Sequence, residues 1–146
     1  MNPGEFITLA GGLVSRGPAG ARSATSRAYY GAYHLAASLL DDFQCSCPRV
    51  GRNHDLLPKL LASASHGDAK RAAGLLDDLH GERVRADYHM QRTDSEDQNV
   101  AKMSVETAAK IQSLLNSFRA DCSTPSVAQD LQNGVASVKR ANGIPV

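Results

Sequence analysis

The chain has 146 residues, of which 42% are hydrophobic and 21% are charged, and its formal net charge is +1. This length fits one domain with its own hydrophobic core, and the small net charge excludes a strong overall field that would attract nucleic acid or membranes. No apolar run is long enough to span a bilayer, and the N-terminus lacks the features of a secretory signal, so we expect a cytoplasmic protein.

Hydrophobic residues recur at helical spacing along the whole chain, which predicts an all-α fold. Alanine is abundant and no run alternates as a strand would. The first helix is expected to start at Asn2, which can cap it, with Pro3 in the first turn and Glu5 completing a capping box. Gly17-Pro18 is expected to end it.

The second helix is predicted from about Ala21 to Phe43, and it has two chemically different faces. One face is apolar and should point into the core; it consists of Tyr29, Tyr33, Ala36, Leu40 and Phe43. The other face is polar and carries Arg27, Tyr30, His34 and Ser38. This helix therefore combines a packing face with a face equipped for chemistry.

Residues 45–53 are predicted to form a loop, followed by a short helix whose regular part starts near Pro58. After a turn, the next helix begins near Asp68 and has an apolar stripe through Ala72, Leu75, Leu76 and Leu79. The same stripe continues through Arg83, Ala86 and Met90. An arginine on such a stripe must be paired or must serve a site, because burial of an unpaired charge is prohibitive.

Residues 91–97 are predicted as a loop, with Thr93 and Glu96 forming the capping box of the next helix. That helix has the clearest apolar stripe: Val100, Met103, Thr107, Ile111, Leu114 and Phe118. A last helix is expected to be capped by Ser123 or Thr124, with Pro125 at its first position, and residues 141–146 should fray. We therefore predict a bundle of four to five helices over residues 1–120, and an additional C-terminal helix and tail over 121–146.

The three cysteines, Cys45, Cys47 and Cys122, do not form an even set for a disulfide framework. A metal site at Cys45 and Cys47 would need further ligands, and His54 is the nearest candidate. We expect reduced thiols, no metal and no cofactor.

Two segments stand out from the helical background. They are Ser26-Arg27-Ala28-Tyr29-Tyr30-Gly31-Ala32-Tyr33-His34-Leu35-Ala36 and Glu82-Arg83-Val84-Arg85-Ala86-Asp87-Tyr88-His89. In this order they resemble the HEPN family, whose members often carry an S-R-x-Y-Y-x-x-[FY]-H-x-A helix and a later R-x-x-A-D-Y segment. The resemblance covers about residues 3–118. It implies an up-and-down helical bundle that usually forms a homodimer.

The resemblance also implies a function. Many members of the family cut RNA without a metal, as toxins or defence proteins, and use an R-x(4-6)-H motif near the dimer axis. Arg83 and His89 match that motif as R-x5-H, and they are the candidate catalytic residues. Related toxins often read R-x4-H-x-Y, whereas Met90 and Gln91 follow His89 here. A cognate small nucleotidyltransferase or antitoxin is the partner that such toxins imply.

The residue types suit this chemistry. RNA cleaves itself when its 2′-hydroxyl attacks the adjacent phosphate, a step that needs a base, an acid and a cation. Histidine titrates near neutral pH, and arginine matches the geometry of phosphate oxygens. A two-fold dimer would supply two of each residue across a shared cleft.

Several side chains have two possible roles. Arg83 and Asp87 lie one helical turn apart and form either an internal ion pair or a phosphate-binding group that Asp87 orients. Arg27, Tyr30 and His34 form either a polar network between helices or a surface that contacts RNA. Tyr88 either packs or stacks on a base. Three functions remain: a metal-independent endoribonuclease, a non-catalytic HEPN module that binds a nucleotide, an RNA or a protein partner, and a plain helical scaffold whose motifs serve dimerisation.

Overall fold

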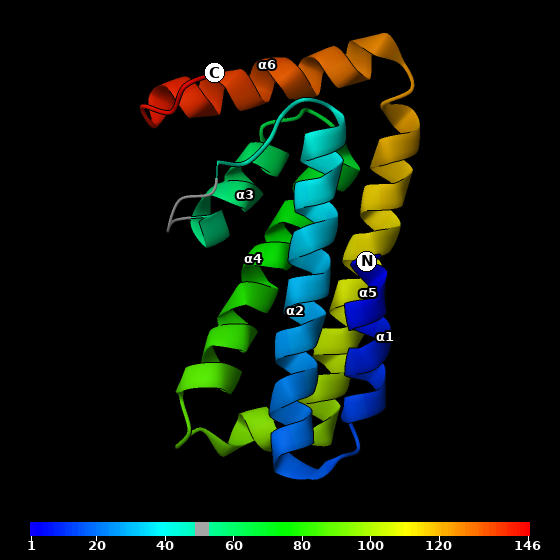
Figure 1. Ribbon diagram of the computed structural model, residues 1–146, viewed down its shortest axis with the longest axis vertical. Coiled ribbons are helices and arrows are strands. Elements are labelled where there is room, and N and C mark those ends of the chain that lie inside the picture. The colour runs from blue at the N-terminus through cyan, green and yellow to red at the C-terminus, as the bar shows by residue number, and fades with distance from the viewer. Residues whose placement is uncertain (49–52) are drawn as a thin grey trace. The chain divides into compact units, whose positions relative to one another are not determined.

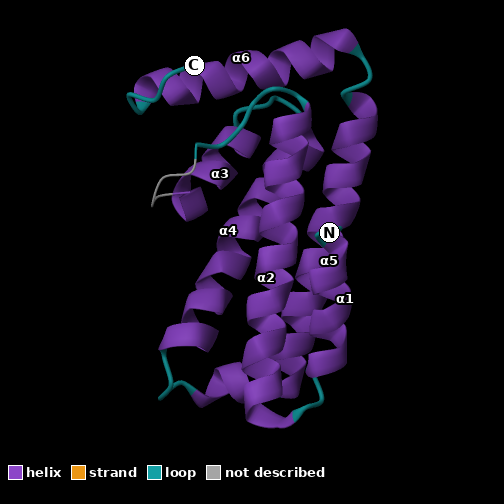
Figure 2. Ribbon diagram, in the orientation of Figure 1, coloured by secondary structure: helices purple, strands orange, loops and turns teal. Residues whose placement is uncertain are grey.

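The computed structural model describes residues 1–48 and 53–146, and within these ranges the chain is all-α with no strand (Figure 1, Figure 2). The elements, in chain order, are α1 (Gly4–Leu13), α2 (Gly17–Asp42), α3 (Asn53–Ala62), α4 (Gly67–Tyr88), the short 3-10 helix η1 (Thr93–Glu96), α5 (Gln98–Asp121) and α6 (Pro125–Ala141). The predicted all-α helical bundle is confirmed. None of the helices in the described ranges is long and apolar enough to cross a membrane.

The start of the chain follows the prediction in part at Asn2 and departs from it at Gly17. Pro3 occupies the N-cap position of α1, and the Asn2 side-chain oxygen accepts a hydrogen bond of 2.9 Å from the backbone N–H of Gly4, the first residue of the helix. Helix α1 already ends at Leu13, however, and Gly17, with φ of +74°, opens α2. Pro18 fits there because a helix does not need the N–H groups of its first turn. The start predicted at Ala21 is therefore too late.

Helix α3 begins five residues before Pro58, near which it was predicted to start. It starts at Asn53 and contains Pro58, so the expectation that regular helix begins near Pro58 is wrong. Pro58 is itself buried with its leucine neighbours, so packing holds this segment helical despite the missing donor. Of the loop predicted over residues 45–53, residues 45–48 are irregular and residues 49–52 lie outside the described part.

The capping box predicted at Thr93 and Glu96 is also wrong. The side chain of Asp97 caps α5, because its Oδ1 accepts hydrogen bonds from the backbone N–H groups of Asn99, at 2.7 Å, and Val100, at 3.2 Å. Thr93 and Glu96 belong to η1 instead. The helix therefore begins at Gln98, close to the predicted region but with a different cap.

The described residues form two compact units, and α2, α4 and α5 each contribute to both. Unit 1 consists of residues 1–35 and 75–112, and unit 2 of residues 36–74 and 113–146. All the residues proposed from the sequence as a functional site belong to unit 1.

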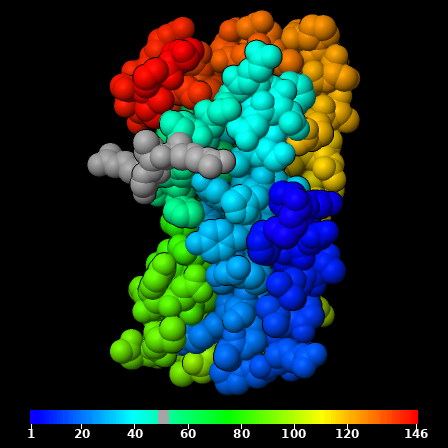
Figure 3. All heavy atoms as spheres, in the orientation of Figure 1, coloured from blue at the N-terminus to red at the C-terminus, as the bar shows by residue number. Residues whose placement is uncertain are grey.

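Unit 1 has an alanine-rich core that lets its helices approach closely. Its fully buried alanines are Ala10, Ala21, Ala24, Ala28, Ala32, Ala86, Ala101 and Ala108. A Cβ added to Gly31 of α2 would lie 2.7 Å from Cγ1 of Ile7 and 3.2 Å from the Pro3 carbonyl oxygen, so only glycine permits this contact with α1. Figure 3 shows the side chains of α1 and of the first half of α2 against each other on the face of unit 1 that it displays.

Unit 2 has a larger-residue core built mainly from leucine. Its helices α3 and α6 pack together at Gly134, where an added Cβ would lie 2.5 Å from the backbone oxygen of Ser63. The turn after α3 is tied to α6 through Asp130, which accepts hydrogen bonds from the backbone N–H of Ser65, at 2.7 Å, and from its hydroxyl, at 3.0 Å. The C-terminal helix therefore shares one compact unit with α3.

The polar interior is confined to unit 1. Among the described residues, the buried polar and charged ones are Arg22, Thr25, Ser26, Arg83, Ser95 and Ser104, and each of them lies in that unit. Buried polar groups need hydrogen-bond partners, which constrains the side chains around them. Their clustering makes unit 1 the part of the described chain in which a functional site is expected.

Candidate functional site

Arg83 of α4 is the centre of the candidate site. It is 9% exposed, and its Nε lies 2.9 Å from Oδ2 of Asp87, one helical turn further along. Its Nη2 donates hydrogen bonds to the hydroxyl oxygens of Tyr30, at 2.6 Å, and Tyr88, at 3.3 Å. The Arg83 Nε–H is not aligned for a hydrogen bond to the carboxylate, so this contact is an ion pair without one. Of the two roles considered from the sequence, the internal ion pair is present in the structure.

Aromatic rings surround the guanidinium of Arg83. Its Cζ lies 5.1 Å from the ring centroid of Tyr30, 5.2 Å from that of Tyr88 and 5.9 Å from that of Tyr29. Such contacts stabilise a cation where water is scarce. The hydroxyl of Ser26 donates a hydrogen bond of 3.1 Å to Asp87 Oδ2, so the two sequence segments meet through a shared carboxylate as well as through Tyr30.

Arg27 and His34 extend this cluster along the polar face of α2. The Cζ of Arg27 lies 5.4 Å from the Tyr30 ring and 5.8 Å from the ring of Phe6 in α1. The exposed imidazole of His34 stacks at 6.3 Å on Tyr30 and at 6.2 Å on Phe6. The structure therefore connects six of the seven predicted site residues: Arg27, Tyr30, His34, Arg83, Asp87 and Tyr88.

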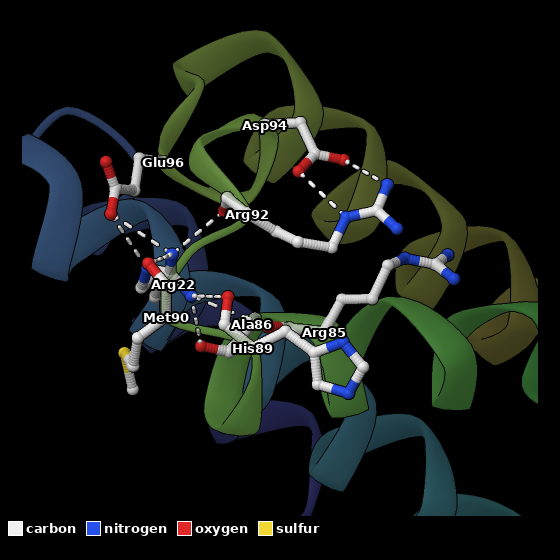
Figure 4. Close-up of polar contacts among 8 residues, drawn as sticks. All are labelled: Arg22, Arg85, Ala86, His89, Met90, Arg92, Asp94 and Glu96. Atoms are coloured by element: carbon white, nitrogen blue, oxygen red, sulfur yellow. Dashed lines mark hydrogen bonds and ion pairs between the residues drawn. The ribbon is translucent and has the colours of Figure 1, made fainter.

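His89 is the seventh residue, and its side chain lies outside this cluster. It follows the last residue of α4 and is exposed. Its backbone is held: the N–H donates to the Arg85 carbonyl at 3.1 Å, and the carbonyl accepts from the Arg92 N–H at 3.0 Å. The imidazole makes no hydrogen bond or ion pair with any described residue, and Figure 4 shows it directed away from Arg22. The ring is accessible to a ligand but does not contact Arg83.

Arg22 is a second buried arginine, and it was not predicted from the sequence as a site residue. It is 8% exposed and reaches from α2 to the end of α4 (Figure 4). Its guanidinium donates hydrogen bonds to five backbone carbonyls, those of Arg85 (3.5 Å), Ala86 (2.9 Å), His89 (3.4 Å), Met90 (3.2 Å) and Arg92 (2.9 Å). It also pairs with Oε1 of Glu96 at 3.1 Å. A cation at this end of a helix satisfies carbonyls that have no partner within the helix.

A sequence signal for Arg22 exists. The core face of α2 carries Tyr29 and Tyr33, and steps of three and four residues backward from Tyr29 lead to Ser26 and Arg22. Arg22, like Arg83, is therefore a charged residue on an inward-facing stripe, which predicts that it is paired or serves a site. Glu96, predicted to cap a helix, is the acid that pairs with it.

The surface at the end of α4 exposes an aromatic ring and several charged side chains. Tyr88 is 66% exposed and Met90 is 62% exposed, and both flank His89. Arg85 is paired with Glu82, and Arg92 with Asp94 at 3.2 Å. The hydrogen bond from Arg92 is the main cause that lowers the pKa of the exposed Asp94 carboxyl below its usual value. This surface therefore presents a tyrosine ring, an imidazole and two arginines that are each paired with a carboxylate.

A groove between α4 and α5 in unit 1 has two acidic side chains in its lining. Its volume is about 290 Å³, and it is lined by Asp78, Leu79, Glu82, Val100, Met103, Ser104 and Thr107. Its lining is mostly apolar and its two charged groups are carboxylates. Carboxylates repel phosphate, so this groove is a poor site for RNA.

The cysteines belong to unit 2 and not to the candidate site. Cys45 and Cys122 are buried and Cys47 is half-buried, and all three are free thiols. Burial is the main cause that raises the pKa of each thiol above its ordinary value. A protonated, buried thiol is a poor nucleophile and a poor metal ligand.

Comparison with known proteins gave no relative: no protein-family model, no curated protein and no solved structure matches this chain. The functional interpretation therefore depends on the residues and geometry described above.

Proposed function

We propose that this protein is a metal-independent endoribonuclease of the HEPN toxin or defence type, acting as a homodimer. The observation that carries the proposal is the convergence of the two resembling segments on Arg83, beside a surface that exposes Tyr88 and His89. A packing role alone does not require a buried arginine, two tyrosine hydroxyls and an accessible imidazole at one end of one helix.

The proposed reaction is transesterification within the RNA. The 2′-oxygen attacks the adjacent phosphorus, its proton passes to a base, and the bond from phosphorus to the 5′-oxygen breaks as that oxygen receives a proton from an acid. The products are a 2′,3′-cyclic phosphate and a 5′-hydroxyl. His89 serves as the base or the acid, and a second copy of the chain supplies another His89 for the complementary role.

Arg83 is proposed to bind the reacting phosphate. Its Nε faces Asp87 and its Nη2 serves the two tyrosines, whereas Nη1 has no hydrogen bond within the described part of the chain. Nη1 is therefore the atom left for a phosphate oxygen. Asp87 and Tyr30 would hold the guanidinium in a fixed orientation, which lowers the entropic cost of binding the transition state.

The test is cleavage of mixed-sequence RNA in excess chelator by the wild type, His89→Ala and Met90→Ala. We expect the His89→Ala protein to be about 100- to 10,000-fold slower, because a general acid or base is lost, with an unchanged fold since the side chain is exposed. Met90→Ala, a change at an exposed neighbour, should retain activity. Products ending in a 2′,3′-cyclic phosphate are expected. Full activity of His89→Ala, or loss of activity in chelator, would contradict the mechanism.

One observation favours a second candidate, a non-catalytic HEPN module that binds a nucleotide, an RNA or a cognate small nucleotidyltransferase. Arg83 is occupied by Asp87, Tyr30 and Tyr88, and it does not contact the imidazole of His89. The same experiment separates the two candidates, because a module of this kind would leave every RNA intact while the wild type still bound its ligand.

A further inference from the structure

Arg27 is a guanidinium with no anionic partner in the described chain. It is partly buried, and no hydrogen bond or ion pair joins it to any described residue. Its contacts are instead with the faces of the Phe6 and Tyr30 rings, at 5.8 Å and 5.4 Å from Cζ. A guanidinium lying on aromatic rings is held in orientation while its N–H groups stay available to an external acceptor.

His34 lies two helical turns after Arg27 and uses the same two rings. The His34 imidazole is nearly parallel to Phe6, with an interplanar angle of 25°, and to Tyr30, with an angle of 26°. It is exposed, so one planar group remains accessible beside the unpaired cation. Phosphate beside a planar base is the repeating chemistry of a nucleic acid.

The rings of Phe6 and Tyr30 form the platform that carries Arg27 and His34, and packing between α1 and α2 holds it in place. Phe6 comes from α1, and the Cβ of Phe6 would lie only 3.2 Å from a Cβ added at Gly31 of α2. The absence of a side chain at Gly31 leaves room for α1 to approach α2 closely at Phe6. The platform therefore exists before any ligand arrives, which favours binding.

The platform is also continuous with the proposed reaction site. The Tyr30 ring contacts both arginines, with the Cζ of Arg27 at 5.4 Å and the Cζ of Arg83 at 5.1 Å from its centroid. A strand whose scissile phosphate is bound by Arg83 would therefore meet Arg27 next along this surface. Neither Arg27 nor His34 is needed for the proposed bond cleavage.

We propose that Phe6, Arg27, Tyr30 and His34 form a subsite for single-stranded RNA, in which Arg27 binds a backbone phosphate outside the scissile bond and a base stacks on His34. The inference rests on the proposed function in taking RNA as the ligand. A single strand is specified because only unpaired bases can stack on side chains.

The experiment measures binding, so that it does not depend on cleavage. A fluorescent 2′-O-methyl oligoribonucleotide, which lacks the attacking hydroxyl, is titrated with protein at several salt concentrations and followed by anisotropy. Neutralising one phosphate contact lowers the slope of log K against log salt by about 0.7 for single strands. Arg27→Gln should show this decrease, and Arg27→Lys should retain the slope because it keeps the charge.

The matched control is Arg71→Gln, which removes an exposed arginine of α4 in unit 2 and should leave the slope unchanged. His34→Ala should weaken binding roughly tenfold through lost stacking. Circular dichroism on each variant verifies that the fold is intact, and His34→Ala, a change at an exposed residue, tests the subsite if Arg27→Gln does not fold.

Three results would overturn the subsite: an unchanged slope in Arg27→Gln, an equal decrease in Arg71→Gln, or no binding of the oligonucleotide by the wild type. A protein partner on this surface is the alternative that the last result would favour. The subsite and the proposed function can fail separately. If Arg27→Gln weakens binding but the wild type does not cleave unmodified RNA, only the nuclease proposal is contradicted. If the wild type cleaves RNA but Arg27→Gln does not change binding, only the subsite is contradicted.

Discussion

The charges of two buried arginines in unit 1, Arg22 and Arg83, are compensated in different ways. Arg83 is compensated by a carboxylate and by aromatic rings, whereas Arg22 is compensated mainly by backbone carbonyls at the end of a helix. Compensation by Asp87 leaves the charge pair dependent on one partner. Compensation by carbonyls ties the charge to a backbone conformation.

The first expectation at this scale concerns Arg83→Met. The substitution removes the charge and leaves Asp87 with Ser26 as its remaining partner. We expect the free energy of unfolding to fall by about 2 kcal/mol. This loss is smaller than for a fully buried pair, because the Asp87 side chain is 27% exposed. Urea denaturation measures it. Arg85→Met is the control, since its pair with Glu82 is more exposed and should contribute at most about 0.5 kcal/mol. Equal losses in the two variants would contradict this account.

The two arginines also differ in how readily the sequence predicts their burial. Arg83 was predictable because it interrupts a visible leucine stripe. Arg22 precedes Ser26 on a stripe that becomes apolar only at Tyr29, so the pattern around it is weaker. Neither pattern identifies Glu96 as the acid beside Arg22, because that pair joins residues far apart in the sequence.

At the scale of elements, Arg22 acts on the segment that carries His89. Its hydrogen bonds to the carbonyls of His89, Met90 and Arg92 keep the chain close to α4 after the helix has ended. The capping box predicted from Thr93 and Glu96 failed for the same reason, since the Glu96 carboxylate is engaged by this guanidinium. A side chain that could cap a helix does not do so when a buried charge needs it as a partner.

We therefore expect Arg22→Met to loosen this segment selectively. The backbone N–H groups of His89 and Arg92, which are both hydrogen-bonded in the structure, should exchange with solvent at least about tenfold faster. Hydrogen exchange followed by NMR measures both. Glu96→Gln is the control and should have a smaller effect, because an amide oxygen still accepts from Arg22. Unchanged exchange at these two positions would show that other contacts hold the segment.

Two glycines give a matched pair for helix packing in unit 2. Gly134→Ala would place a Cβ 2.5 Å from a backbone oxygen of Ser63, so we expect a loss of about 1–3 kcal/mol as α3 and α6 separate. Gly74→Ala, on α4 with nothing within 4 Å of the new Cβ, should instead stabilise by about 0.5–1 kcal/mol. Thermal unfolding distinguishes opposite signs, and a stabilising Gly134→Ala would disprove the close approach.

At the scale of the molecule, the fold class was predictable and the division into units was not. Periodic apolar stripes of three and four residues identify helices wherever they occur. Each unit, however, combines two stretches of chain that are distant in sequence, and no composition change marks residues 35 or 112. The confinement of buried polar residues to unit 1 becomes visible only when those stretches are brought together.

The remaining expectation concerns the homodimer and follows from the proposed chemistry. One exposed imidazole cannot be both the base and the acid in a single cleavage, so each cleft requires His89 from two copies. Mixing the wild type with an equal amount of His89→Ala protein, under conditions where subunits exchange, would leave about one quarter of the dimers with two imidazoles. At the same total protein concentration, activity should therefore fall to that fraction of the wild-type value, while an equal mixture with Met90→Ala should leave it unchanged. Light scattering establishes that the mixed species are dimers. A fall to one half would mean that each chain cleaves with its own His89, and the shared cleft would then be wrong.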